Sequence, residues 1–246
     1  MQLVGIDLAW MGERNSSGLA CGVIQSNRLH VTEMHSGVLG LRAIKNILER
    51  QHHMVGVAID GPLIIRNASG SRAAEKALSK RYAKHWASCH PSNLKLHPNA
   101  ISVKLSEWLL DRGIKHLGNP AVQRWQVECY PHPALIELFS LQKRLAYKKG
   151  RVLKKKSGQM QLAEMLLSLN FNRQLRLVIP EKYQVMFDPF YISELKGAAL
   201  KKNEDALDAV VCLYIAGLYA IGQTFHVFGD VEEGYIVVPY FDTLDA

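Results

Sequence analysis

The sequence predicts one α/β domain with a mixed sheet, in which three antiparallel strands are followed by parallel strands and helices cover both faces. Short runs rich in Val, Ile and Leu open the chain, and later apolar runs alternate with segments of helical period. With 246 residues, 48% of them hydrophobic, the chain can bury a large core. We expect a single domain over residues 1–246, with an insertion around 143–200 and a C-terminal extension at 223–246.

The first three predicted strands follow one another directly along the chain. Residues 3–8 form an apolar run that is typical of a buried strand, and residues 19–24 and 29–32 have the composition of two more. Ser26 and Asn27 give the second and third strands the spacing of a hairpin. The opening is therefore predicted to be an antiparallel meander.

Helices and strands then alternate. Residues 37–50 carry apolar side chains at helical intervals, and the apolar run 54–59 follows. A strand, a helix and a strand in this order imply a right-handed crossover and a parallel strand. Asn203 is the expected N-cap of the last helix. The other predicted elements are helices at 71–86, 102–112, 133–142, 158–169 and 204–221, a strand at 123–129, and a hairpin within 225–240.

Charge and cysteine content favour a basic, intracellular protein with a polyanionic partner. The formal net charge is +8, which suits nucleic acid but describes attraction rather than a site. Four scattered cysteines suit reduced thiols in the cytoplasm, and the N-terminus lacks the features of a signal peptide. We also expect no membrane span, because the longest uncharged stretch is diluted by Ala, Gly, Cys and Tyr.

A basic segment at residues 143–156 is the clearest local charge feature. It contains eight basic residues and no acidic one, with Tyr147 among them. It could contact phosphates, or it could be a solvated loop and helix start. Its basic residues are Lys143, Arg144, Lys148, Lys149, Arg151, Lys154, Lys155 and Lys156.

Acidic residues lie at the ends of three predicted strands and at the start of the last helix. Asp7, Asp60 and Glu128 end strands, and Asp205 and Asp208 are three residues apart on one helical face. Each has an ordinary explanation, since acids often end strands and favour the first turn of a helix. However, an ionised carboxylate after an apolar run is costly unless it is paired, hydrogen-bonded or bound to a cation.

Four segments carry a family resemblance: GIDLAW (5–10), AIDGPL (58–63), ECYPHPAL (128–135) and NEDALDAVVCLYIA (203–216). In this order they resemble domain-of-unknown-function family 429, whose members are predicted ribonuclease-H-like nucleases. The resemblance implies a ribonuclease-H-like sheet and a metal site at Asp7, Asp60 and the Asp205/Asp208 pair. Holliday-junction resolvases are similar in using acids on these elements. His132 stands where the family pattern more often has an acid.

The chemistry implied is metal-assisted hydrolysis of nucleic-acid phosphodiesters. Mg²⁺ and Mn²⁺ prefer carboxylate and water ligands, and two ions about 3.5–4 Å apart could activate water and stabilise the leaving oxygen. We expect Asp7 to bridge the ions, and Asp60 and Asp208 to hold one each. Further roles are expected for Asp205 and Glu128 within the catalytic group, and for Arg72, Lys148, Lys149, Arg151, Lys154, Lys155 and Lys156 in binding nucleic acid.

Three alternatives stay open from the sequence. A small actin-like or sugar-kinase-like phosphotransferase could share the opening strand, although the chain has no glycine-rich phosphate loop. A non-catalytic nucleic-acid-binding module would need only the basic segment and Tyr147. Cys129 and His132, or Cys89, His90 and His97, could hold zinc, but the paired spacing of zinc sites is missing. The sequence does not distinguish DNA from RNA.

Overall fold

The computed structural model describes residues 1–10 and 15–241 and contains one mixed sheet. The strand order is β7-β3-β2-β1-β4-β6-β9-β8, with β5 beside β6. The strands β1, β2 and β3 are antiparallel, whereas β4 is parallel to β1 and β6 is parallel to β4. This confirms the predicted fold class, a ribonuclease-H-like mixed sheet. The strands are β1 (Gln2–Asp7), β2 (Ser16–Gln25), β3 (Arg28–Leu39), β4 (Met54–Asp60), β5 (Lys115–His116), β6 (Trp125–Cys129), β7 (Arg176–Val178), β8 (Phe225–Asp230) and β9 (Gly234–Pro239).

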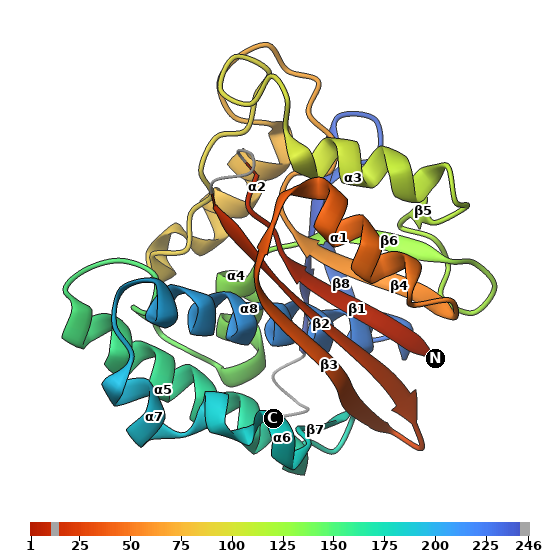
Figure 1. Cartoon of the computed structure of the whole chain (residues 1–246). Helices are drawn as coiled ribbons and strands as arrows, with labels where there is room; N and C mark the ends of the chain where they lie inside the picture. The colour runs from red at the N-terminus through yellow and green to blue at the C-terminus, as the bar shows by residue number, and fades with distance from the viewer. Residues whose placement is uncertain (11–14, 242–246) are drawn as a thin grey trace.

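Helices pack on both faces of this sheet. On one face, α1 (Gly40–Glu49) and α3 (Ile101–Leu110) cover a cluster that includes Ile6 and Ile59. On the other, α8 (Gly197–Ala220) crosses the strands, flanked by α4 (Pro131–Phe139) and α5 (Val152–Ser168) (Figure 1). The remaining helices are α2 (Ala73–Tyr82), α6 (Glu181–Gln184) and α7 (Pro189–Glu194), with single 3-10 turns at Ala83–His85, Leu169–Phe171 and Val185–Phe187.

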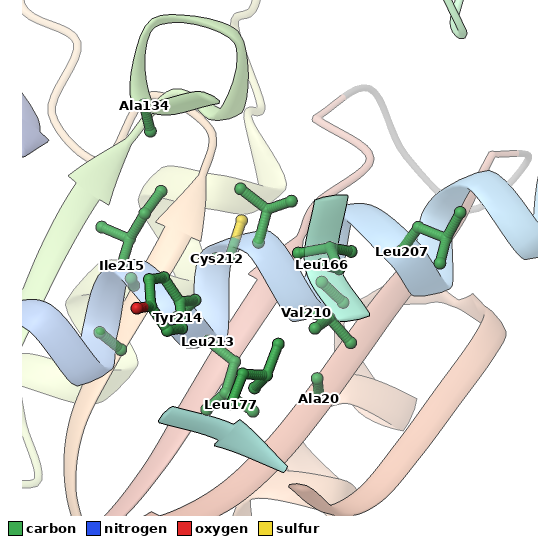
Figure 2. Packing of buried hydrophobic residues seen from close by; sticks show 14 of the residues in the cluster. Ala20, Ala134, Leu166, Leu177, Leu207, Val210, Cys212, Leu213, Tyr214 and Ile215 are labelled. Atoms are coloured by element: carbon green, nitrogen blue, oxygen red, sulfur yellow. The ribbon is translucent and has the colours of Figure 1, made fainter. Parts of the chain in front are cut away.

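The helix α8 lies unusually close to β1 and β2. A Cβ atom added at Gly5 would lie 2.0 Å from the backbone nitrogen of Leu213, and one added at Gly18 would lie 2.0 Å from the carbonyl oxygen of Asp205. Only glycine permits this approach. Figure 2 shows the result, with Val210 and Leu213 of α8 packed near Ala20 of β2. The acids on α8 are thereby brought down onto the sheet.

The start of α8 differs from the prediction. We expected Asn203 to cap a helix at 204–221, but the helix begins at Gly197, and every residue from Asn203 to Leu218 is buried. The side chain of Asn203 instead donates to Gln159 Oε1 at 3.2 Å. The preceding Ala, Leu and Lys residues are good helix formers and continue the helix backwards. Asp205 and Asp208 therefore lie within the helix rather than in its first turn.

The segment 143–200 and the C-terminal tail both add to the sheet. The helix α5 begins at Val152, not at residue 158, and β7 pairs in parallel with β3 and forms one edge of the sheet. The tail forms the hairpin β8–β9, whose inner strand β9 lies beside β6. Within residues 1–10 and 15–241, no helix combines the length and apolar composition needed to span a membrane.

Candidate active site

The pairing of β1 with β4 sets two acids side by side. Asp7 and Asp60 are the last residues of their strands and are direct partners in the parallel ladder. Paired residues of neighbouring strands point to the same face of a sheet. Gly5 shares this face with Asp7 and is the residue over which α8 crosses. The structure therefore brings Asp208 of α8 to the same place.

Lys148 lies among these three acids. Its Nζ atom is 2.9 Å from Asp208 Oδ2, 3.5 Å from Asp60 Oδ2 and 3.8 Å from Asp7 Oδ1. Tyr147 donates a hydrogen bond of 2.7 Å from its hydroxyl to Asp208 Oδ1, which fixes the orientation of that carboxylate. We call Asp7, Asp60, Asp208 and Lys148 the carboxylate site. Acids from three separate segments of the chain thus surround one cation from a fourth.

Burial and crowding alter the acidity of this site. Burial raises the pKa of Asp7 well above its usual value; Lys148 opposes this, and the charges of Asp208 and Asp60 add to it. Burial also raises the pKa of Asp60 to about 6. For Lys148, burial alone would lower the pKa, but the attraction of Asp208 and Asp7 carries it well above its usual value. The lysine is a cation, and it does not fully compensate the acids around it.

Glu128 and Arg72 are not part of the carboxylate site. Glu128 pairs with Ile59 in the β4–β6 ladder, whereas Asp60 pairs with Cys129, so Glu128 points to the other face. There it accepts hydrogen bonds from Arg72 and, at 2.8 Å, from the backbone N–H of Leu63. We call Arg72, Glu75 and Glu128 the arginine cluster. All three are nearly inaccessible to solvent.

Asp205 is close to the carboxylate site but has its own partners. Ser16 donates to its Oδ2 at 2.6 Å, and Lys201 lies 2.7 Å from its Oδ1. The side chain is fully buried and makes no ion pair with Lys148 within the described part of the chain. Of the two acids predicted on the last helix, only Asp208 faces Lys148.

The predicted basic residues are divided between two places. Lys148 lies in the carboxylate site and Lys149 lines the pocket beside it. Arg151, Lys154 and Lys155 lie at the start of α5, where Arg151 and Lys154 are exposed. Lys156 donates to the carbonyl of Ser193. Tyr147 is completely buried, so it is not the exposed stacking surface that a binding module would need. Arg72 is likewise occupied by glutamates rather than open to phosphate.

A pocket of about 260 Å³ opens beside the carboxylate site. Its lining includes residues of both the carboxylate site and the arginine cluster. Some of the other lining residues were not predicted to belong to a site. Two buried polar atoms in its lining, His132 Nδ1 and Ser92 Oγ, have no hydrogen-bond partner among the described residues. One sequence feature points to His132, because it stands where the family pattern more often has an acid. Further lining residues are Trp10, Tyr130, Arg144 and Lys149.

Comparison with known proteins identifies a family but no activity. The family model described as Protein of unknown function (DUF429) matches residues 5–233. The chain belongs to this family. Neither the curated proteins nor the solved structures contain a match to it. Membership in DUF429 confirms the predicted family resemblance. The family description itself indicates no activity.

In this DUF429 chain, the carboxylate site offers the oxygen ligands that a hard cation prefers, and the ammonium group of Lys148 lies among them. Among residues 1–10 and 15–241, no group of three His, Cys, Asp or Glu side chains has an arrangement that could hold a metal ion as it stands. The cysteines and histidines of the zinc alternative therefore form no such group either. Cys129 and Cys212 are free thiols with their sulfur atoms 3.7 Å apart. The three aspartates nonetheless surround one positive charge with oxygen atoms, the ligand type that Mg²⁺ and Mn²⁺ prefer.

Proposed function

We propose that this protein is a metal-dependent nuclease that hydrolyses phosphodiester bonds at the carboxylate site. The observation that carries this proposal is the convergence of Asp7, Asp60 and Asp208 on one ammonium group. When all four groups are ionised, three carboxylates and one lysine leave two negative charges in excess. A buried excess of this kind is costly unless a cation compensates it, and two positive charges are what a divalent metal brings.

Asp7, Asp60 and Asp208 would hold Mg²⁺ or Mn²⁺. When bound, such an ion supplies a more acidic water and stabilises charge on a phosphate. Tyr147 keeps Asp208 oriented through its hydrogen bond, and Asp205, already held by Ser16 and Lys201, would support α8 rather than bind metal. Lys148 has a flexible side chain that is 24% exposed, so it can move from the carboxylates to a phosphate oxygen.

The proposed substrate is nucleic acid, DNA or RNA, and the proposed location is the cytoplasm. The net charge of +8 and the exposed basic residues at the start of α5 support a polyanionic partner. Cys129 and Cys212 lie close together as free thiols, which supports a reducing compartment.

A cleavage assay with a matched pair of variants tests the proposal. The parent protein should cut single-stranded or duplex DNA or RNA in Mn²⁺ or Mg²⁺ and be inactive in EDTA. Asp60→Asn removes one ligand with little change in shape and should lower the rate by on the order of 100-fold or more. Asp111→Asn, which makes the same chemical change at an exposed helix end, should leave the rate unchanged. Equal rates for Asp60→Asn and the parent, or cleavage in EDTA, would refute a metal-dependent nuclease.

A further inference from the structure

Two cations that line the pocket beside the carboxylate site, Arg144 and Lys149, form no ion pair with an acid among the described residues. Arg144 is half-buried in its lining, and within the described residues it makes no ion pair with any carboxylate. Lys149 also lines the pocket, and its Nζ contacts His90 Nε2 at 3.1 Å rather than an acid. A partly desolvated guanidinium without a counter-ion is expensive, so an anionic ligand would stabilise this arrangement.

A second, independent observation concerns His132. Its side chain is only 4% exposed, and its Nδ1 atom has no hydrogen-bond partner among the described residues. The ring is held edge-on between Tyr130 and Tyr147, at centroid distances of 5.7 and 5.2 Å. Buried polar atoms in folded proteins almost always have a partner, whether protein or water or ligand. His132 therefore lines this pocket and holds a buried nitrogen that no described residue satisfies.

His132 also connects the pocket to the proposed chemistry. Tyr147, against which its ring packs, donates to Asp208 of the carboxylate site. Burial, together with the nearby charges of Lys148, Arg144 and Lys149, lowers the pKa of His132 well below its usual value. The ring is therefore neutral, with one N–H to donate and one nitrogen to accept.

We propose that Arg144 and Lys149 bind the phosphate group of a single nucleotide in this pocket, next to the carboxylate site and beside His132. The planar guanidinium of Arg144 can give two parallel hydrogen bonds to phosphate oxygens, and Lys149 adds a point charge. The pocket, at about 260 Å³, lies near the lower end of the size range of small-ligand sites and admits one nucleotide rather than a length of duplex. Trp10 and Tyr130, also in the lining, provide aromatic surface for a base.

This inference rests on the proposed nuclease function and narrows its substrate. A nucleotide inside a duplex would have to leave the base stack to enter such a pocket, at a cost in stacking and pairing energy. For a nucleotide at a chain end or in a single strand, the free-energy cost of unstacking and unpairing is smaller. The expected substrate is therefore a terminal or unpaired nucleotide, positioned so that the phosphodiester beside it faces the carboxylate site.

The test is a binding measurement that needs no metal. Deoxyadenosine monophosphate, titrated in EDTA and followed by calorimetry, should bind the parent protein. Arg144→Gln should weaken its binding by about tenfold or more, because one charge-assisted contact is lost. Arg173→Gln, which removes the same charge from an exposed position outside the pocket, should bind as the parent does. Lys149→Gln, at an exposed side chain whose loss does not endanger folding, should weaken binding as well.

Two further ligands decide what the pocket recognises. Deoxyadenosine, which lacks the phosphate, should bind much more weakly than the monophosphate. Orthophosphate should also bind more weakly, since it lacks the base and sugar. Equal binding of orthophosphate and the nucleotide would overturn the assignment to a nucleotide, and equal binding of the nucleotide by the parent and by both Arg144→Gln and Lys149→Gln would overturn the assignment to these residues.

Asp60→Asn separates this inference from the nuclease proposal. It should abolish metal-dependent cleavage and yet bind deoxyadenosine monophosphate in EDTA at least as well as the parent, because it removes a negative charge near the phosphate. Nucleotide binding without any metal response would support the nucleotide pocket and refute the metal-dependent nuclease. A metal response without nucleotide binding would support the nuclease and refute the nucleotide pocket.

Discussion

The carboxylate site and the arginine cluster contain similar groups but differ in how their charge is compensated. Each places buried acids around one cation, and the two share a pocket. Arg72 makes four side-chain hydrogen bonds, with Glu75, Glu128 and the carbonyl of Ile64. Lys148 instead divides one ammonium group among three carboxylates at 2.9, 3.5 and 3.8 Å. Arg72 therefore meets its acids through several directed hydrogen bonds, whereas Lys148 is a single point charge shared by three acids.

Exposure also differs between the clusters, except at Asp208, which is fully buried. The side chains of the arginine cluster are 2–4% exposed, whereas those of Asp7 and Asp60 are 12% exposed and that of Lys148 is 24% exposed. Burial alone would lower the pKa of Arg72, but Glu128 and Glu75 raise it above its usual value. In the carboxylate site, Asp208 and Asp7 likewise raise the pKa of Lys148. Burial raises the pKa of Asp7 and Asp60, as it does that of Glu128. The two clusters therefore differ in hydrogen bonding and exposure, not in the direction of these pKa shifts.

Removing the cation of the arginine cluster should have the largest effect on stability. Arg72→Met would leave Glu75 and Glu128 buried without their partner, and losing one member of a buried ion pair typically costs about 3–5 kcal/mol. Chemical denaturation should report a loss of this size, equal in EDTA and in Mn²⁺, because the side chains of Glu75 and Glu128 are only 2–4% exposed. A loss below about 1 kcal/mol, or a rescue by Mn²⁺, would show that the two clusters do not differ as described.

The difference between the clusters depends on strand register, which the sequence alone does not reveal. Asp7, Asp60 and Glu128 all end apolar runs, so all three were predicted to converge. In the sheet, Asp7 pairs with Asp60, but Glu128 lies one position away from the residue that pairs with Asp60. A shift of one residue turns a side chain to the opposite face. The acids were therefore predictable, but their grouping was not.

Long elements were predicted better than short ones. The apolar patterns of β1, β4 and α8 are strong enough to identify them, as is the turn between β2 and β3. The three-residue strand β7 has no pattern of its own and exists because it pairs with β3. Tyr147 shows the same limit, since it lies in a basic segment and yet packs into the core with its hydroxyl on Asp208. Such contacts arise only when distant segments meet.

Removing the cation of the carboxylate site should have a smaller effect, and one that metal reverses. Lys148→Met should destabilise the metal-free protein by about 1.5–3 kcal/mol, less than Arg72→Met, because protons can neutralise part of the exposed charge. Mn²⁺ should then stabilise the variant more than the parent, since no ammonium competes for the carboxylates. Thermal melting with EDTA and with Mn²⁺ measures both effects. If the Mn²⁺ shift is smaller in the variant than in the parent, Lys148 assists metal binding and is not its competitor.

The smallest expected change in metal-free stability is at Asp7, where it is also the most informative. Asp7→Asn removes a buried charge that lies beside Asp60 and Asp208, so the metal-free variant should be as stable as the parent, within about 0.5 kcal/mol, or slightly more stable. At a Mn²⁺ concentration 100 times the dissociation constant, the parent should gain about 2.7 kcal/mol, and the variant should lose most of that gain. A structural role for Asp7, like that of Glu128, predicts the reverse: a metal-free loss of about 1 kcal/mol or more with the Mn²⁺ response intact. Melting curves of both proteins in EDTA and in Mn²⁺ distinguish the two, and a destabilised variant with an undiminished Mn²⁺ shift would assign Asp7 to the framework rather than to a metal.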